Sequence, residues 1–219
     1  MRLAGCLPGD LILDAGCGNG RHAPPLARLG YRVVGLDRAA VLLGAARRES
    51  RGLPWPRFVS GSYAATGFKP GTFDAVFCLG SALGYLGESG DRAALCEFQR
   101  VLAPGGRLVI ETLHRDEIGV RLAEHEERQL ASGGTICFDR RIDRVRGTMR
   151  ETQWLSDEGP DARRGYEMSI YRENELRRML ERAGFEIVAR HGSLDGTGEP
   201  SDGTPLVLVA ETASPLSSG

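Results

Sequence analysis

A short apolar run that ends in a glycine cluster constrains the fold of this chain most strongly. Residues 10–14 read Asp-Leu-Ile-Leu-Asp, and Gly-Cys-Gly-Asn-Gly follows at 16–20, before a helical stretch through Leu29. A strand, a glycine turn and a helix in this order predict the first unit of an α/β sheet. The order then repeats, because Gly30 ends the helix, 31–36 is a second strand leading to Asp37, and 39–49 is a second helix. Such a repeat predicts parallel strands joined by right-handed crossovers.

The remaining chain extends this pattern and interrupts it once. We expect further strands at 57–60, 73–79, 107–112, 185–190 and 205–212, and further helices at 91–102 and 173–182. About seven strands fit one domain in a chain of 219 residues.

Residues 114–171 do not follow the strand–helix rhythm. We expect a polar helix at 121–129 and strands around 135–138, 149–155 and 166–170, and we interpret the segment as an antiparallel β insertion. The insertion has two equally favoured roles: it is a structural flap that makes a contact in a homodimer, or it covers the substrate. We expect the tail 214–219 to be disordered.

Composition excludes several classes of function. No apolar run reaches the eighteen residues of a membrane span, and the start of the chain lacks the apolar stretch of a signal peptide, so we expect a cytoplasmic protein without membrane contact. A net charge of −1 without a basic block gives little attraction for nucleic acid. The five cysteines are scattered, which predicts neither a disulfide framework nor a metal site.

Carboxylates at the ends of the first two strands narrow the choice of ligand. A glycine turn before a helix binds many nucleotides, but the third glycine of the dinucleotide fingerprint is replaced by Arg21, so a nicotinamide cofactor fits poorly. Asp14 would repel a pyrophosphate and attract ammonium and sulfonium charges by about 1 to 4 kcal/mol. Asp37 can accept both hydroxyls of an adenosine ribose. The sign of the charge therefore favours a cationic nucleoside.

Four segments, in order, now carry a resemblance to a known family. Residues 14–20 have the form Asp-x-Gly-x-Gly-x-Gly, and Gly-Ser-Tyr-Ala at 61–64, Phe-Asp-Ala-Val at 73–76 and Arg-Val-Leu-Ala-Pro-Gly-Gly at 100–106 follow. With these residues the chain resembles class I S-adenosylmethionine-dependent methyltransferases of the small-molecule type, closely over 10–112 and more loosely over 175–185. The resemblance implies a Rossmann-like three-layer αβα sandwich with strand order 3-2-1-4-5-7-6 and an antiparallel last strand. It also implies methyl transfer to an O, N or C nucleophile of a small metabolite, with release of S-adenosylhomocysteine.

The same resemblance implies which residues bind S-adenosylmethionine. They are Asp14, Gly16, Cys17, Gly18, Asp37, Arg38, Ser62, Tyr63 and Leu79. The family often has an aspartate where this chain has Ser62, so a hydroxyl or backbone group must hold the adenine amino group. Only nine residues precede the first strand, so the insertion or a partner subunit is expected to cover the cofactor, if anything does.

Catalytic candidates come from the loops after the fourth and fifth strands, because ligands of open α/β sheets bind at the carboxyl ends of strands. Tyr85 is a candidate contact to the methyl acceptor, or else a packing residue. His114 is a candidate general base, with a surface histidine as the alternative, and Arg115 is a weaker candidate for binding a substrate carboxylate. His22 is expected to cap the first helix or to contact the methionine end of the cofactor, rather than to act in catalysis. The loop at 78–85 lacks Asn/Asp-Pro-Pro-Tyr, which disfavours methylation of adenine or amide nitrogen.

Two other functions stay open at this point. A non-catalytic protein that binds S-adenosylmethionine would keep the glycine loop without turning over an acceptor. A nicotinamide-dependent oxidoreductase is less favoured, for the reason given for Arg21. Turnover with labelled cofactor separates the first from an enzyme, and NAD binding identifies the second.

Overall fold

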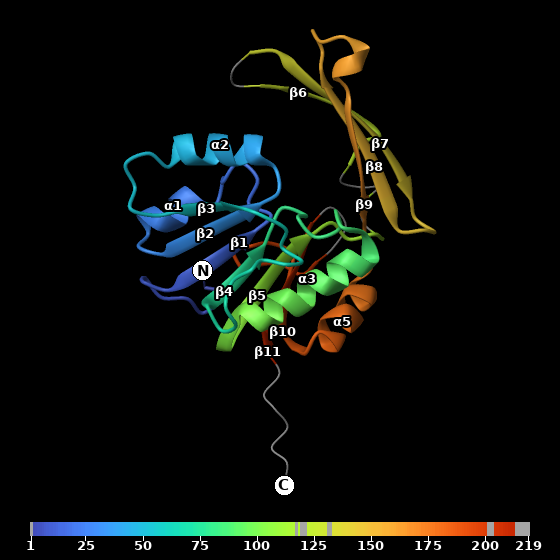
Figure 1. Ribbon diagram of the computed structural model, residues 1–219. Helices are drawn as coiled ribbons and strands as arrows, with labels where there is room; N and C mark the ends of the chain where they lie inside the picture. The colour runs from blue at the N-terminus through green and yellow to red at the C-terminus, as the bar shows by residue number, and fades with distance from the viewer. Residues whose placement is uncertain (1, 117, 119–121, 131–132, 201–203, 213–219) are drawn as a thin grey trace.

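A seven-stranded sheet forms the centre of the molecule. The computed structural model describes residues 2–116, 118, 122–130, 133–200 and 204–212, so the tail expected to be disordered lies outside the described residues. The strands lie in the order β10-β11-β5-β4-β1-β2-β3 (Figure 1). Their bounds are β1 Leu11–Ala15, β2 Arg32–Asp37, β3 Arg57–Ser60, β4 Phe73–Cys78, β5 Leu102–Thr112, β10 Phe185–His191 and β11 Leu206–Thr212.

The pairing of these strands confirms the expected topology. β1 is parallel to β2 and β4, β2 is parallel to β3, and β4 is parallel to β5, whereas β11 is antiparallel to both β5 and β10. The predicted order 3-2-1-4-5-7-6 with an antiparallel last strand is therefore correct. β5 begins earlier than expected, since Leu102 pairs with Phe73 and an irregularity separates this pair from Arg107. The predicted Pro-Gly-Gly turn thus lies inside the strand as a bulge.

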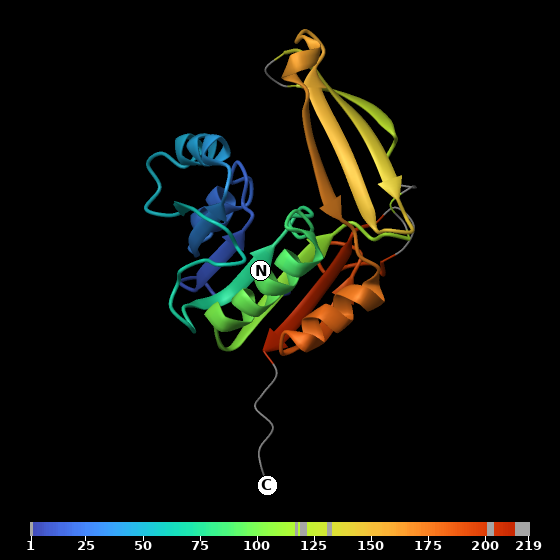
Figure 2. The same ribbon diagram turned by 45° about the vertical axis from the view of Figure 1, so that its right-hand side comes forward.

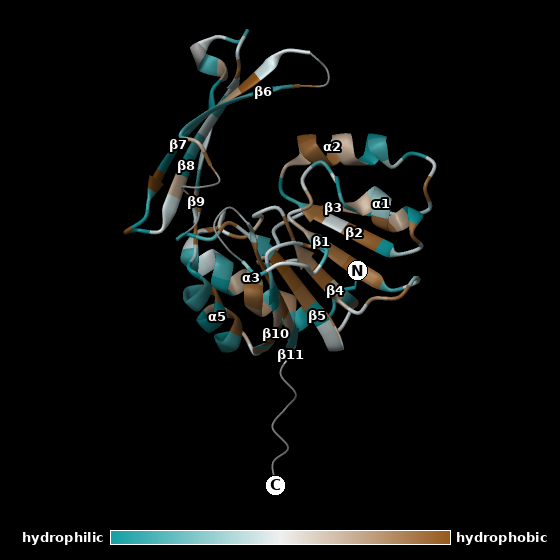
Figure 3. Cartoon of the chain, turned by 180° about the vertical axis from the view of Figure 1, so that it is seen from behind, coloured by the Kyte–Doolittle hydropathy of each residue, from teal (hydrophilic) through white to brown (hydrophobic). Residues whose placement is uncertain are grey.

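Helices cover both faces of this sheet. On one face, Phe98 of α3 (Gly87–Val101) and Leu176 of α5 (Glu173–Arg182) share a buried cluster with Leu13 of β1. On the other face, Ala23 of α1 (Ala23–Arg28) joins Ile12 in a second cluster, and α2 (Ala40–Glu49) packs beside β2 and β3. Figure 3 shows the hydrophobic strands lying between these helices. The three-layer αβα sandwich is confirmed, and no helix in the described residues is long and apolar enough to cross a membrane.

The insertion is a separate four-stranded antiparallel sheet with the order β6-β7-β8-β9. Its strands are β6 His125–Gln129, β7 Thr135–Asp143, β8 Thr148–Leu155 and β9 Arg164–Ser169, with a 3-10 helix at Pro160–Ala162. It rises from the end of the core sheet at which β5 ends (Figures 1 and 2). The predicted polar helix is wrong where the structure describes it, because 125–129 pairs with 135–139 as a strand. Pairing with a neighbouring strand here outweighs the helical preference of glutamate and arginine.

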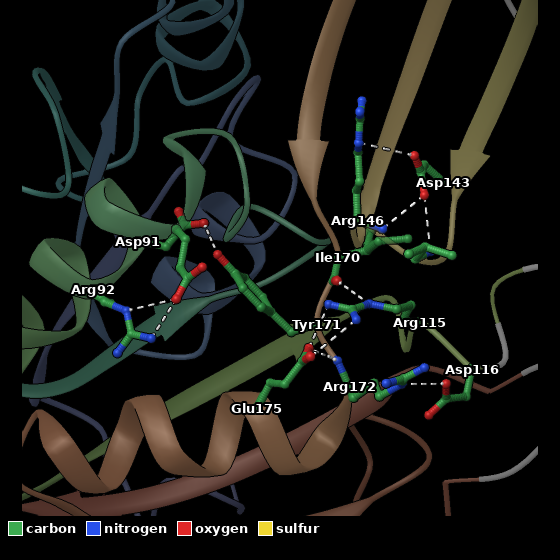
Figure 4. Close-up of polar contacts among 12 residues, drawn as sticks. Asp91, Arg92, Arg115, Asp116, Asp143, Arg146, Ile170, Tyr171, Arg172 and Glu175 are labelled. Atoms are coloured by element: carbon green, nitrogen blue, oxygen red, sulfur yellow. Dashed lines mark hydrogen bonds and ion pairs between the residues drawn. The ribbon is translucent and has the colours of Figure 1, made fainter.

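A joint of buried polar contacts fixes the end of β9 to the core (Figure 4). The Tyr171 hydroxyl donates to Asp91 at the start of α3 at 2.6 Å, and the other oxygen of Asp91 accepts the Gly84 N–H at 3.2 Å. The Ser169 N–H donates to the Gly84 carbonyl at 2.9 Å. Asp91 is fully buried, and burial raises its pKa against the opposing effect of the Tyr171 hydrogen bond. The loop after β4 and the last strand of the insertion are therefore held together at one point.

Candidate active site

The glycine loop after β1 is held against the end of β2 by backbone bonds. The N–H groups of Gly16 and Cys17 both donate to the Leu36 carbonyl, at 2.8 and 3.1 Å. Gly16 has a φ of +75°, and a Cβ there would lie 2.6 Å from the Cβ of Ala82. Neither the backbone conformation nor the space allows a larger residue. The loop therefore approaches the chain after β4 more closely than any side chain would permit.

Asp37 at the end of β2 anchors this loop and faces a cavity. Its two carboxylate oxygens accept the N–H groups of Gly18 and Ala39, each at 2.8 Å. A carboxylate oxygen has room for a second donor, so ribose hydroxyls can bind in addition. A Cβ on Gly18 would meet only Leu42, at 3.9 Å, and both residues line the cavity. The loop thus leaves open the space that a nucleoside beside Asp37 needs.

Asp14 lies beneath the loop with a buried oxygen that lacks a partner. Its side chain is 2% exposed, and its Oδ2 makes no hydrogen bond within the described part of the chain. Burial raises the pKa of Asp14 to about 7, and the charge of Asp37 adds to this rise, while the charge of Arg21 opposes it. An unpartnered buried carboxylate is costly, and a cationic ligand nearby relieves that cost. The residues present therefore fit a cofactor that carries ammonium and sulfonium charges.

A cavity of about 630 Å³ opens in front of the loop. Its volume lies in the range of small-molecule sites. The core contributes most of the lining residues: Gly16, Gly18, Asp37, Arg38, Ala39, Leu42, Tyr63, Gly80, Ala82, Tyr85 and Leu86. The insertion contributes Gln153 from β8 and Tyr166 from β9. The cavity is thus bounded by the glycine loop on one side and by the insertion on another.

Two tyrosines from different parts of the chain meet at this cavity. Tyr85 follows β4 and is 44% exposed, and its ring centroid lies 5.1 Å from that of Tyr166 at an interplanar angle of 45°. Because Gly84 is bonded to Ser169, the segments that carry the two rings cannot separate without breaking the joint. The pair therefore forms a fixed aromatic wall.

The loop after β4 is also tied to the end of β5. The Gly80 N–H donates to a carboxylate oxygen of Glu111 at 2.8 Å, and the Ser81 N–H donates to the Glu111 carbonyl at 3.0 Å. Ser81 has a φ of +60°, a backbone conformation that is uncommon outside glycine and frequent at functional sites. The two loops expected to bind substrate are consequently one connected unit.

The residues expected to bind the cofactor fall into two groups. Those that line the cavity are Gly16, Gly18, Asp37, Arg38 and Tyr63. The others lie close by without lining it: Asp14 is buried, the Cys17 thiol packs beside Gly35, the Ser62 hydroxyl accepts the Ala64 N–H at 3.2 Å, and Leu79 lines a second, apolar cavity of about 230 Å³. The contact of each residue to the cofactor stays a prediction.

The catalytic candidates are separated by the structure. Tyr85 lines the cavity, but His114 does not, and its Nδ1 is buried without a partner among the described residues. Arg115 donates to the Ile170 carbonyl at 2.9 Å and to both oxygens of Glu175 at 3.1 and 2.6 Å (Figure 4). Its guanidinium is thus engaged in contacts beside the joint. His22 lines the apolar cavity, and burial lowers its pKa.

Sequence reasoning missed the cavity residues of the insertion. Gln153 and Tyr166 lie on the face of the small sheet that also carries the buried Met149 and Met168. The alternation of Met149, Glu151 and Gln153 could have indicated one inward face, had the strand register been known.

Comparisons with known proteins agree with this geometry. Residues 12–106 match the family model described as a methyltransferase domain. A demethylmenaquinone methyltransferase from Renibacterium salmoninarum is 32% identical over 115 residues, which are 52% of this chain and 46% of that protein. The chain thus spans about half the length of the curated relatives it matches.

Solved structures match over nearly the whole chain. The CcbJ methyltransferase from Streptomyces caelestis has a TM-score of 0.82 at 25% identity, covering 97% of this chain and 86% of that one. CalS10 with bound S-adenosylmethionine, an amino pentose methyltransferase from Micromonospora echinaspora, has a TM-score of 0.63 at 26% identity, covering 93% and 84%.

Proposed function

We propose that this chain is a class I S-adenosylmethionine-dependent methyltransferase, which methylates an O, N or C nucleophile of a small metabolite and releases S-adenosylhomocysteine. One observation carries the proposal. A single cavity of about 630 Å³ is lined both by the glycine loop and Asp37 and by Tyr85 and Tyr166. Methyl transfer needs two reactants in contact and away from water, and such a cavity supports that arrangement.

The residues of the chain have distinct tasks in this proposal. S-adenosylmethionine, when bound, supplies a methyl group on a positively charged sulfur. Asp37 accepts the ribose hydroxyls, Gly16 and Gly18 let the ligand approach the backbone, and the charge of Asp14 balances the cationic end of the ligand. Tyr85 and the insertion orient the acceptor. Most of the rate enhancement then comes from holding the acceptor in line with the methyl group.

Calorimetry and turnover test the proposal in two steps. Titration with S-adenosylmethionine, S-adenosylhomocysteine and NAD should give binding of the first two only. A screen of metabolites with methyl-labelled cofactor should then give labelled product together with S-adenosylhomocysteine. Binding without turnover of any metabolite would favour the non-catalytic alternative, and tight binding of NAD alone would refute the assignment.

Location and assembly are further parts of the proposal. We infer a cytoplasmic protein, which is supported by five free thiols, of which Cys17, Cys78 and Cys137 are buried. A homodimer in which the insertion makes the contact stays a prediction of the sequence. Fractionation of cells and analytical ultracentrifugation test these two points.

A further inference from the structure

Three charged and polar side chains form a ladder across the insertion. Arg140 on β7 lies opposite Glu151 on β8, and Glu151 lies opposite Tyr166 on β9. Arg140 donates to one oxygen of Glu151 at 2.5 Å, and the Tyr166 hydroxyl donates to the other oxygen at 2.5 Å. Arg140 and Glu151 are 4% and 6% exposed. The ladder therefore runs from a buried ion pair to a residue that lines the cavity.

The ladder fixes the direction in which the Tyr166 hydroxyl donates its hydrogen bond. A charged carboxylate has no proton to give, so Tyr166 must be the donor in its bond to Glu151. The phenolic oxygen then has two lone pairs left, of which one meets the hydroxyl of the neighbouring Tyr85 and the other is left for a molecule in the cavity. Burial, together with the bond to Glu151, raises the pKa of Tyr166, so the hydroxyl keeps its proton. Besides its contact with Tyr85, Tyr166 consequently offers one hydrogen-bond acceptor to a molecule in the cavity.

We propose that Tyr166 and Glu151 together accept the proton that the methyl acceptor loses, an inference that rests on the proposed function. The acceptor atom forms a bond to the methyl carbon while the carbon–sulfur bond breaks. The electron pair of the broken bond goes to sulfur, which becomes neutral. The proton of the acceptor passes to the phenolic oxygen of Tyr166 as the hydroxyl proton of Tyr166 passes to Glu151. Glu151 later releases this proton to solvent. Tyr166 is the catalytic residue in this step, and Glu151 positions it and stores the proton.

The surroundings of Glu151 permit this change of charge. Arg140 also contacts Glu126 at 2.7 Å, so it keeps a partner when Glu151 becomes neutral. Hydrogen bonds from Arg128 and Arg140 lower the pKa of Glu126, which therefore stays ionised. The charge of Arg140 therefore has a partner before and after the proton transfer. This matters because an unpaired buried charge is costly.

Binding of an amine analogue tests the inference without knowledge of the acceptor. In sinefungin a carbon that carries an amine replaces the sulfonium with its methyl group, so N–H groups point from the methyl position toward the side from which the acceptor approaches. We expect Tyr166→Phe to weaken sinefungin binding about tenfold, the effect of one charge-assisted hydrogen bond, and to change S-adenosylhomocysteine binding less than about twofold. Glu151→Gln keeps the shape of the ladder and removes its charge, and it should weaken sinefungin binding several-fold. Tyr31→Phe, on the opposite face of the core sheet, is the matched control and should change neither affinity.

The outcomes separate this inference from the proposed function. Wild-type protein that binds neither ligand would refute the proposed function and the inference with it. If the wild-type protein binds both ligands, and the ratio of its affinities for sinefungin and S-adenosylhomocysteine is unchanged in Tyr166→Phe and Glu151→Gln, the inference is overturned and the proposed function stands. With an acceptor from the metabolite screen, both variants should lower kcat by about 100-fold or more without raising the KM for S-adenosylmethionine, the range expected for loss of a general base. Unchanged kcat would contradict the proton transfer.

Discussion

Replacement of Asp14 by asparagine should stabilise the free protein and remove the pH dependence of cofactor binding. The folded protein raises the pKa of Asp14 to about 7 from its ordinary value of 3.8, chiefly by burial. The folded state therefore holds a proton that the unfolded chain has lost. The stability contributed by this group is fully present below about pH 4 and is lost as the pH rises through about 7.

The shift sets the magnitude of the effect. A difference of about three pKa units corresponds to about 4 kcal/mol, all of it acting against the folded state above pH 7. The asparagine side chain does not titrate, so the gain in unfolding free energy of Asp14→Asn over wild type should be about 2 to 3 kcal/mol larger at pH 8 than at pH 5. Urea denaturation at the two pH values measures this difference.

Cofactor affinity should show the opposite trend in the wild type. A cationic ligand binds the ionised form of Asp14, which is scarce at pH 5, so the affinity for S-adenosylmethionine should rise about 50-fold between pH 5 and pH 7. Calorimetry in buffers of different ionisation enthalpy should show that the protein releases a proton on binding. Asp14→Asn should bind weakly with a flat profile. A flat profile in the wild type, or a variant that keeps the pH dependence, would show that the buried carboxylate does not face the cationic end of the ligand.

Three further substitutions test the loop and the joint. Gly16→Ala should lower both stability and cofactor affinity by about 1 to 3 kcal/mol, because it adds a steric clash to an unfavourable φ. Gly52 has a similar φ but lies in open space, so the control Gly52→Ala should cost only the backbone strain, about 1 kcal/mol. Equal losses of unfolding free energy for the two variants in urea denaturation would refute the close approach at Gly16. Tyr171→Phe leaves Asp91 buried with one partner fewer and should lower the unfolding free energy by about 1 to 3 kcal/mol, and a change below about 0.5 kcal/mol would contradict the role of the joint. Asp37→Ala should weaken S-adenosylmethionine binding by about 1 to 3 kcal/mol in calorimetry, and unchanged affinity would remove Asp37 from the site.

The sequence was sufficient for the core and its first loop, for local reasons. Apolar runs followed by glycine and a helix indicate strands and their direction without reference to the rest of the chain, as 10–29 illustrates. The order of the strands came from the resemblance of four ordered motifs, and the structure confirms it. The cavity at the ends of β1, β2 and β4 followed from that order.

The insertion could not be predicted with the same accuracy, because its structure depends on pairing between strands. Residues 125–129 are charged and suit a helix by propensity, yet they extend along β7. Arg115 illustrates the same limit, since its partner Glu175 is sixty positions away in the chain. Tyr166 acquires its place in the cavity only through the register of β8 and β9. Long-range register leaves little trace in local sequence.

The joint between Gly84, Ser169, Asp91 and Tyr171 has a consequence for how such proteins diversify. The small sheet enters and leaves the core at one anchored corner, and the glycine loop with Asp37 lies outside it. Residues 125–169 can therefore be exchanged as a module between relatives while the cofactor-binding half stays intact. Choice of acceptor and retention of cofactor are consequently free to evolve at different speeds.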